Sequence, residues 1–301
     1  MATIPKGLNL SLAPAALEIS FPKETAAALG TRLRFILQSL KPLQPKNVLD
    51  IGCGTGEHLT SHLSTFLPNT QIWGVDSDER TIAHATGRFS YISNLTFSTK
   101  IPDDIQFNAI IASEVLEHVH NPYVFLLDLK QRLRDDGRII LTLPNGYGCS
   151  EMMSFLEVSL SLIGVLPLIA FVKKKTQLAH REQQLSFHDT MANSPHINFF
   201  DFGRISHLFE ECGLDVHYYQ GRMFLHNFLF TFILDRSEKL SRLNARWGGE
   251  LPAFMVSDWM FSLEKNTSKT LFPLRIYKRN IYERMKMHLN YLRFGLPKKN
   301  F

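Results

Sequence analysis

The segment VLDIGCGTGE, residues 48–57, limits what this chain can fold into more than any other stretch of the sequence. An apolar run ends in Asp50, and Gly52, Gly54 and Gly56 follow it at alternate positions. Because glycine has no Cβ, such a turn can adopt positive φ and lets a ligand touch main-chain atoms. In open parallel sheets, ligands bind beyond the carboxyl ends of the strands, where the first strand-to-helix turn comes closest. The segment therefore predicts a strand, a ligand-binding turn and a helix.

Apolar strands and amphipathic helices alternate along most of the chain, which is typical of strand–helix–strand units around a parallel sheet. The strands expected from the sequence are 47–51, 71–76, 108–113, 138–144, 214–220 and a last one within 253–265. The expected helices are 24–40, 56–67, 78–89, 121–134 and 201–212. Residues 135–137, Asp-Asp-Gly, and Gly213 are expected to end the last two of these helices.

Length and composition fit one large domain that carries an insertion. The chain has 301 residues, of which 45% are apolar, and this is enough to bury a core. Its three cysteines are odd in number and far apart in the sequence, which favours a reducing, cytoplasmic location over a disulfide framework or a zinc ribbon. The N-terminal stretch lacks the charged start and continuous apolar core of a secretory signal, so we expect none.

The spacing of the glycines discriminates between ligands. A dinucleotide fingerprint is G-x-G-x-x-G, and a P-loop needs Gly-Lys-Ser/Thr, whereas this turn is G-x-G-x-G and continues with Glu57. Asp50 and Glu57 make the turn acidic, which suits a cationic amine better than a phosphate. Asp76 ends the next expected strand, where a carboxylate can accept hydrogen bonds from ribose hydroxyls. An amine at one end and a ribose at the other describe S-adenosylmethionine.

Four segments in the order VLDIGCGTGEHL, GVDSDE, FNAIIASEVLEHV and LRDDGRIILTLPN resemble the motifs of the class I S-adenosylmethionine-dependent methyltransferases. The resemblance covers about residues 45–146, and 196–214 resembles a later helix of the same fold. It implies an α/β, Rossmann-like three-layer sandwich with a seven-stranded, mostly parallel sheet, a reversed final strand and, in this chain, an apolar helical insertion.

The same resemblance implies which residues bind S-adenosylmethionine. Asp50 and the glycine turn would lie near its methionine moiety, and Asp76 near its ribose. Ser98 or Thr99 stands where family members often carry an acid that contacts adenine, and Phe107-Asn108 replaces the usual Phe-Asp pair. The full expected set is Asp50, Gly52, Cys53, Gly54, Gly56, Asp76, Ser77, Ser98, Thr99, Ser113 and Glu114.

The segment Glu114–His118, EVLEH, follows the expected strand 108–113 on the cofactor side of the sheet. E-x-x-E-H resembles the metal-binding motif of ubiquinone-biosynthesis O-methyltransferases and of small-RNA 2′-O-methyltransferases, in which a further histidine comes from near the later helix. His196 holds a comparable place. This implies a divalent ion such as Mg²⁺ on Glu114, Glu117, His118 and His196. Alternatively no metal binds, the two carboxylates orient the cofactor and loop, and His118 or His196 is a general base. The expected catalytic set is His118, His196 and Glu117.

Two segments lie outside the α/β pattern. The insertion at about 145–195 contains the apolar run 154–172 followed by three lysines, and it is expected to be a lid over the acceptor, a helical pair at a membrane interface, or core. From Lys265 to the C-terminus there are ten basic residues and one acid, a charge of +9 that leaves −4 for the rest of the chain. This tail predicts contact with anionic lipid or RNA, or a helix with a solvated basic face. We therefore divide the chain into an N-terminal helical segment 1–45, a methyltransferase domain 46–265 and a helical tail 266–301.

These features favour an S-adenosylmethionine-dependent methyltransferase that acts on a small or lipid-linked acceptor, at oxygen, in the cytoplasm and peripherally at the membrane through 154–172 and 270–301. The first alternative is an RNA 2′-O-methyltransferase, although the apolar insertion makes nucleic acid the less favoured partner. The second is a non-catalytic S-adenosylmethionine-binding, membrane-associated protein. The sequence leaves open the acceptor, the methylated atom, metal dependence and the oligomeric state.

Overall fold

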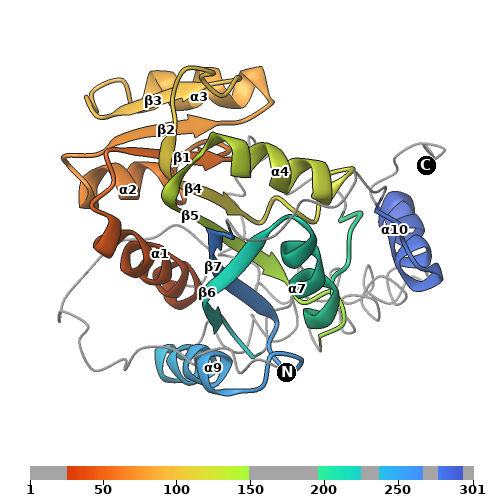
Figure 1. Cartoon of the computed structure of the whole chain (residues 1–301). Coiled ribbons are helices and arrows are strands. Elements are labelled where there is room, and N and C mark those ends of the chain that lie inside the picture. Colours follow the sequence, from red (N-terminus) through yellow and green to blue (C-terminus); the bar gives the residue numbers. More distant parts are fainter. Residues whose placement is uncertain (1–25, 149–195, 225–236, 267–276, 294–301) are drawn as a thin grey trace.

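The computed structural model describes residues 26–148, 196–224, 237–266 and 277–293 (Figure 1). Its centre is one seven-stranded sheet in the order β3-β2-β1-β4-β5-β7-β6. The strands are β1 (Asn47–Ile51), β2 (Gln71–Val75), β3 (Leu95–Ser98), β4 (Phe107–Ser113), β5 (Leu133–Pro144), β6 (Leu214–Gly221) and β7 (Asp258–Lys265). The first five are parallel, and β7 runs antiparallel to both β5 and β6. The predicted fold with a reversed final strand is confirmed.

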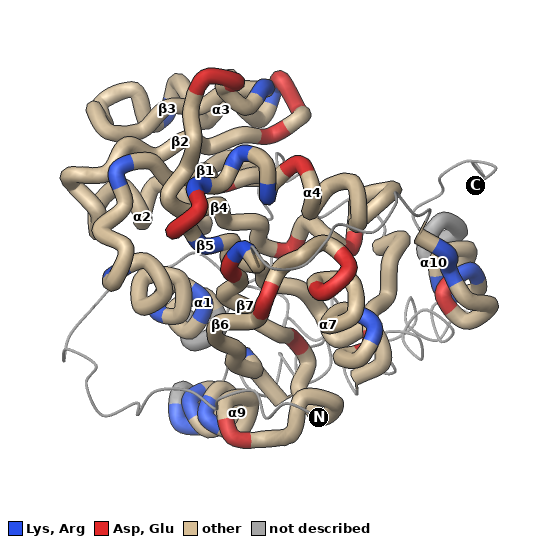
Figure 2. The backbone as a smooth tube through the Cα atoms, in the orientation of Figure 1, with Lys and Arg blue, Asp and Glu red and all other residues tan. Residues whose placement is uncertain are grey.

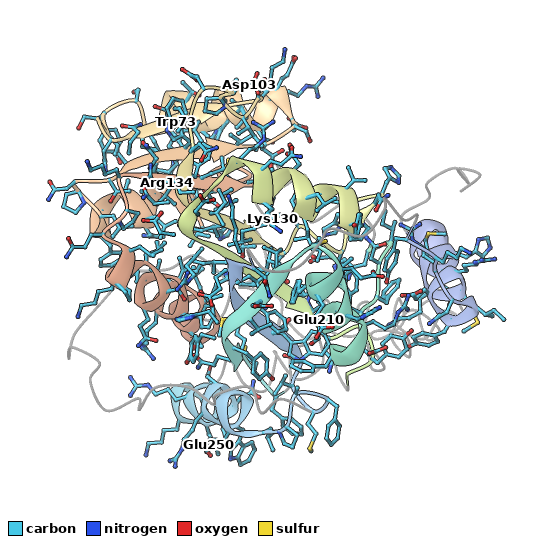
Figure 3. The ribbon with its side chains drawn as sticks, viewed as in Figure 1. Trp73, Asp103, Lys130, Arg134, Glu210 and Glu250 are labelled. Carbon is cyan, nitrogen blue, oxygen red and sulfur yellow. The ribbon has the colours of Figure 1, made fainter. Side chains whose placement is uncertain are left out.

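Helices cover both faces of the sheet, which makes three layers. The helices are α1 (Ala26–Leu40), the 3₁₀ turn η2 (Lys41–Leu43), α2 (Thr60–Phe66), α3 (Glu79–Arg88), α4 (Pro122–Arg132), α7 (Phe202–Glu211), α9 (Glu238–Glu250) and α10 (Ile281–Arg293). Alternation along each strand separates the two faces, because successive side chains point to opposite sides. In β1, Val48 packs with α1 and α2, while Leu49 belongs to the cluster that includes α4 and α7. Lys130 of α4 donates to the carbonyl of Cys212 (3.0 Å) and so ties α4 to the end of α7 (Figure 3).

Polar side chains start several of these helices. Asp78 accepts a hydrogen bond from the amide of Thr81 at the start of α3, and Asp201 accepts one from the amide of Arg204 at the start of α7. Asn121 caps α4, which has Pro122 at its first position. A side-chain acceptor at this place satisfies one of the backbone donors that the first turn of a helix leaves unpaired. The helix starts therefore follow from local sequence.

Five elements differ from those expected: α2, α4, β5, β3 and α9. The second helix begins at Thr60 instead of residue 56, because the glycine turn occupies the intervening residues. The fourth ends at Arg132, and β5 begins at once: Leu133 pairs with Phe107 and Arg138 with Ala109, so residues 134–137 form an irregularity in the strand. No range was expected for the edge strand β3 or for helix α9, because β3 is only half-buried and α9 is mostly polar.

The domain boundaries drawn from the sequence stay predictions. Helix α1 lies within the predicted segment 1–45, and α10 lies within the predicted tail 266–301. The apolar run 154–172 and most of the insertion lie outside the described residues. Among the helices in the part of the chain that the structure describes, none has the length and apolarity needed to cross a bilayer.

Candidate cofactor and catalytic site

The glycine turn connects β1 to α2 at the carboxyl edge of the sheet. Gly52, Gly54 and Gly56 all have positive φ (72°, 54° and 72°), a backbone conformation that residues with a Cβ rarely adopt. The amides of Gly52 and Cys53 both donate to the carbonyl of Val75 (2.7 and 3.1 Å), so the turn is held against the end of β2. A Cβ on Gly54 would meet no heavy atom within 4 Å, although Gly54 is buried. The turn therefore borders open space, as a ligand-binding turn requires.

Asp76 lies directly after β2 and is buried beside the turn. Its Oδ2 accepts a hydrogen bond from the amide of Gly54 (3.0 Å), and its Oδ1 accepts one from the amide of Asp78 (3.0 Å). The amide of Asp76 donates to the carbonyl of Ser98 at the end of β3 (3.3 Å). The structure thus brings together the predicted methionine and ribose ends of the cofactor site. Of the other expected cofactor ligands here, Ser77 and Thr99 are exposed. The side-chain oxygen of Ser98 accepts a hydrogen bond from the amide of Lys100.

Asp50 is the buried carboxylate of the turn. It accepts a hydrogen bond from Thr60 Oγ1 (2.7 Å), and burial raises its pKa to about 7 against the opposing effects of Thr60 and Arg32. Arg32, on α1, is only 8% exposed and donates to Ser113 Oγ (3.0 Å). A guanidinium therefore lies beside Asp50 and the end of β4. The sequence did not identify Arg32 as a candidate, because nothing in the helical pattern of α1 distinguishes it from other helix arginines.

Cys53 contributes backbone to the turn rather than a reactive thiol. Burial raises the pKa of its thiol, and the nearby Asp50 and Asp76 add to that effect. Its Sγ makes a contact of 3.5 Å to the carbonyl of Gly54. A thiol whose pKa is raised stays protonated and is a poor nucleophile.

Glu114 has a strained backbone at the start of the E-x-x-E-H segment. It is one of two non-glycine residues with positive φ (57°) in the part of the chain that the structure describes. Its Oε1 accepts a hydrogen bond from Thr142 (2.7 Å) and lies 3.7 Å from the buried Arg222, which also pairs with Asp258 (3.1 Å). Such strain persists where the surroundings fix it, and it gathers at functional sites.

Glu117, His118 and His196 form a cluster. One ligand atom from each lies within 4.8 Å of the others, and the two imidazole rings meet edge to face with centroids 4.9 Å apart. His118 Nε2 is 3.8 Å from Glu117 Oε1. The side chain of Glu117 is 1% exposed, and its two oxygens have no hydrogen-bond partner among the described residues. The structure therefore brings three of the four predicted ligands together, while Glu114 is engaged by Thr142 and Arg222.

Burial has a second consequence for Glu117. Desolvation raises the pKa of this carboxyl, the neighbouring charge of Glu114 raises it further, and His196 opposes the shift. A buried carboxyl of this kind keeps its charge only when a cation or donors face it.

Backbone hydrogen bonds hold this cluster in place. The carbonyl of Glu117 accepts from the amides of Ile197 and Asn198 (2.9 and 3.0 Å), and the side chain of Asn198 donates to the carbonyls of Leu116 and Val119. The loop also packs on the cofactor turn: a Cβ on Gly52 would lie 2.5 Å from the side chain of Val115. The two halves of the site are thus neighbours.

If Asp76 binds the ribose as the sequence predicts, replacing it by alanine should weaken binding of S-adenosylhomocysteine by on the order of 1–3 kcal/mol, because those hydrogen bonds and the Gly54 contact are both lost. Asp76→Asn keeps one acceptor oxygen and should lose less. Calorimetric titration of the two variants and the wild type measures the difference. An affinity of Asp76→Ala equal to that of the wild type would rule out this carboxylate as a cofactor ligand.

Comparison with known proteins agrees with this geometry. Residues 23–219 match a family model described as a methyltransferase domain. The chain is 31% identical over 120 residues to the mitochondrial ubiquinone biosynthesis O-methyltransferase of Dictyostelium discoideum, a match that covers 35% of this chain and 37% of that protein. It is 30% identical over 113 residues to the tRNA U34 carboxymethyltransferase of Photobacterium profundum, covering 35% of this chain and 34% of that protein.

The chain thus spans little more than a third of the length of either relative. Among solved structures, an S-adenosylmethionine-dependent methyltransferase from Clostridium acetobutylicum is 10% identical, with a TM-score of 0.48 over 79% of this chain and 92% of that one. The family model spans most of the sheet and both halves of the site. The chain therefore belongs to the methyltransferase-domain family, which confirms the class I S-adenosylmethionine-dependent methyltransferase predicted from its sequence.

Proposed function

We propose that this protein transfers a methyl group from S-adenosylmethionine to a hydroxyl of a small or lipid-like acceptor. The observation that carries the proposal is the cluster of Glu117, His118 and His196 beside the cofactor turn. Methyl transfer from a sulfonium is a displacement in which positioning supplies most of the acceleration, but a hydroxyl acceptor must also lose its proton. Two imidazoles next to a buried carboxylate are suited to remove it.

For the cofactor, the proposal places each charged group of its methionine end next to a residue of opposite charge. The methionine amine of the cofactor would face Asp50, its carboxylate would face Arg32, and its ribose hydroxyls would face Asp76. In support, Asp50 and Arg32 are both buried at the same end of the sheet, and Arg32 acts on the pKa of Asp50. A zwitterionic end group needs such a pair of opposite charges at close range.

The pKa of Asp50 predicts that cofactor binding depends on pH. At a pKa of about 7 the free carboxyl is half protonated near neutrality, and only its ionised form pairs with the amine. The affinity for S-adenosylhomocysteine should therefore rise between about pH 6 and about pH 8 and then level off. Calorimetry across this range measures it, with Asp50→Asn as the control. A slope that persists in Asp50→Asn would assign the titration to another group.

The cluster also fits the divalent ion that its motif implies. The buried oxygens of Glu117 lack partners among the described residues, and the imidazoles of His118 and His196 stand within reach of the same point. A bound ion would polarise an acceptor hydroxyl and lower its pKa. One carboxylate and two imidazoles suit Mn²⁺ or Zn²⁺ better than the predicted Mg²⁺, which prefers oxygen ligands. The fourth expected ligand, Glu114, would first have to leave Thr142 and Arg222.

Support for the acceptor class comes from two sources. One relative is named an O-methyltransferase of ubiquinone biosynthesis, and O-methylation is the reaction proposed here. The apolar run 154–172 and the tail 270–301 are the parts proposed to contact a lipid-like acceptor or the membrane that carries it. A second candidate function, methylation of RNA, is favoured by the relative named for tRNA.

A label-transfer assay tests the proposal. The full-length chain would be incubated with methyl-labelled S-adenosylmethionine and four acceptors: catechol, an alkyl catechol, an alkyl phenol and an RNA oligonucleotide. We expect O-methylation of the alkylated acceptors, and a chelator should abolish it if the cluster holds an ion. Label on RNA alone, with binding that weakens steeply as salt rises, would support the second function and contradict the first.

A further inference from the structure

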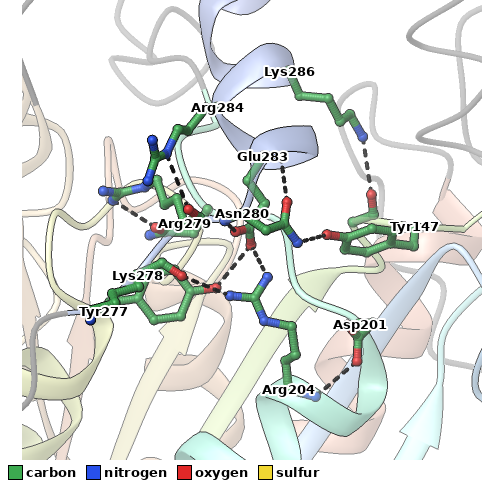
Figure 4. A network of polar contacts seen from close by, with 12 residues as sticks. Tyr147, Asp201, Arg204, Tyr277, Lys278, Arg279, Asn280, Glu283, Arg284 and Lys286 are labelled. Atoms are coloured by element: carbon green, nitrogen blue, oxygen red, sulfur yellow. Dashed lines mark hydrogen bonds and ion pairs between the residues drawn. The ribbon is translucent and has the colours of Figure 1, made fainter.

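We propose that Arg279, which lies beyond the matched methyltransferase domain, is a positioning residue of the candidate site because it joins the two segments that carry His118 and His196. The importance of this role for turnover rests on the proposed function. Arg279 is separated from its partners by about 80 to 160 positions in the sequence, yet its guanidinium reaches both segments. The region shown in Figure 4 is where this C-terminal segment meets the domain.

The guanidinium of Arg279 makes three hydrogen bonds to the site. Its Nε donates to the carbonyl of Ile197 (2.9 Å), and its Nη2 donates to the carbonyl of His120 (3.0 Å) and to Asn198 Oδ1 (2.8 Å). Ile197 adjoins His196 in the chain, and His120 lies two positions after His118. The rigid, planar guanidinium of Arg279 therefore helps to fix the distance between the two segments that carry the imidazoles.

Arg279 adds to the hydrogen bonds that already join the two segments. Residues 196–200 have no regular secondary structure, and 118–121 form an irregular connection between β4 and α4. Sheet hydrogen bonds therefore do not set the separation of the two histidines. The amides of Ile197 and Asn198 bridge the segments through the carbonyl of Glu117, and the side chain of Asn198 adds the carbonyls of Leu116 and Val119. Arg279 thus binds Asn198 and, at the same time, the carbonyls of Ile197 and His120.

Arg279 is itself held by a well-built helix start. Asn280 and Glu283 form a reciprocal cap on α10: the amide of Glu283 donates to Asn280 Oδ1 (2.9 Å), and the amide of Asn280 donates to Glu283 Oε2 (2.6 Å). Glu283 is buried, pairs with Arg204 of α7 (2.5 Å) and accepts from the hydroxyl of Tyr277 (3.1 Å). The backbone around Arg279 is therefore fixed relative to α7.

A second anchor lies one turn further along α10. Lys286 is 4% exposed, donates to the carbonyl of Gly146 (3.1 Å) and lies over the ring of Phe199 at 4.5 Å from its centroid. The side chain of Asn280 donates to the hydroxyl of Tyr147 (2.8 Å). The residue range 277–286 thus packs on the chain just after β5 and on the segment that carries His196.

This docking changes the interpretation of the basic tail. Figure 2 shows basic and acidic positions along α10, and the acidic residue is Glu283. In the described part of the tail, Arg279 and Lys286 point into the protein, whereas Lys278 and Arg284 are exposed. Part of the positive charge assigned from the sequence to lipid or RNA is therefore used inside the protein.

The test is a nuclear Overhauser measurement on the full-length chain with protonated histidines in a deuterated background. The rings of His118 and His196 are close enough to give a cross-peak, which His118→Gln and His196→Gln assign. Arg279→Ala should weaken this cross-peak relative to the wild type, and Arg279→Lys, which keeps a donor but not the fork, should restore part of it. The matched control is Lys278→Ala, whose exposed side chain is next in the sequence and should leave the cross-peak unchanged.

A cross-peak of wild-type intensity in Arg279→Ala would overturn the proposal. If that variant does not fold, Arg279→Lys decides, since a fully retained cross-peak there would also overturn it. Titration of S-adenosylhomocysteine into the same samples separates the two claims: affinity should stay at the wild-type level in Arg279→Ala. Failure of the wild type to bind would count against the proposed function and would leave the cross-peak result standing.

Discussion

Replacing His118 by alanine should reduce methyl transfer to the best hydroxyl acceptor by on the order of 100-fold or more, the usual contribution of a positioned general base. Affinity for S-adenosylhomocysteine should stay close to that of the wild type, because the proposed function assigns His118 to the acceptor and not to the cofactor. The same split is expected for Glu117→Gln, which removes the buried carboxyl beside both imidazoles. Initial rates of S-adenosylhomocysteine release and calorimetric affinities measure the two quantities.

His120→Ala is the matched control for that experiment. His120 is exposed. The hydrogen bond that Arg279 donates to it uses its backbone carbonyl, which alanine keeps. We expect its rate to equal that of the wild type. Equal rates for His118→Ala, His196→Ala and the wild type would show that the cluster takes no part in the transfer and would leave only the cofactor half of the account.

Replacing Glu283 by alanine should lower the free energy of unfolding by about 3 kcal/mol, the low end of the range for breaking a buried ion pair. Glu283 is 0% exposed and its partner Arg204 is 29% exposed, so water screens only one side of the pair. The variant also loses the cap of α10 and the contact with Tyr277. Urea unfolding of the full-length chain, followed by circular dichroism, measures the change.

The exposed pair of Arg246 and Glu250 on α9 provides the control. Its atoms approach to 2.9 Å, but the two side chains are 70% and 54% exposed, so Glu250→Ala should change stability little. If Glu283→Ala were as stable as Glu250→Ala, α10 would not be docked through this ion pair, and the anchoring of Arg279 would lose its basis.

The positions of the glycine turn and of Asp76 were predictable because their determinants are local. The glycine spacing alone requires a turn with positive φ, and Asp76 follows from the end of the next apolar strand. The E-x-x-E-H segment was also found from sequence, since it directly follows β4. By contrast, the separation of Glu114 from Glu117 and His118 depends on Thr142 of β5 and on Arg222, which directly follows β6.

Residues that act over long sequence separations were not predictable. Arg32 looks like any helix arginine until the fold places it beside Ser113. Arg279 and Lys286 belong to a run of mixed cations and aromatics that equally describes a membrane-binding helix, and only their partners at positions 120, 146, 197 and 198 reveal an internal role. Strand β3 has only four half-buried residues, too few for periodicity to distinguish it from a loop.

The most direct test of the central claim is a calorimetric titration of the purified full-length chain with S-adenosylhomocysteine. The account predicts saturable binding at one site, and Asp76→Ala should weaken it. Absence of binding by the wild-type chain across the concentrations at which the titrant is soluble would contradict the assignment of the glycine turn as a cofactor site.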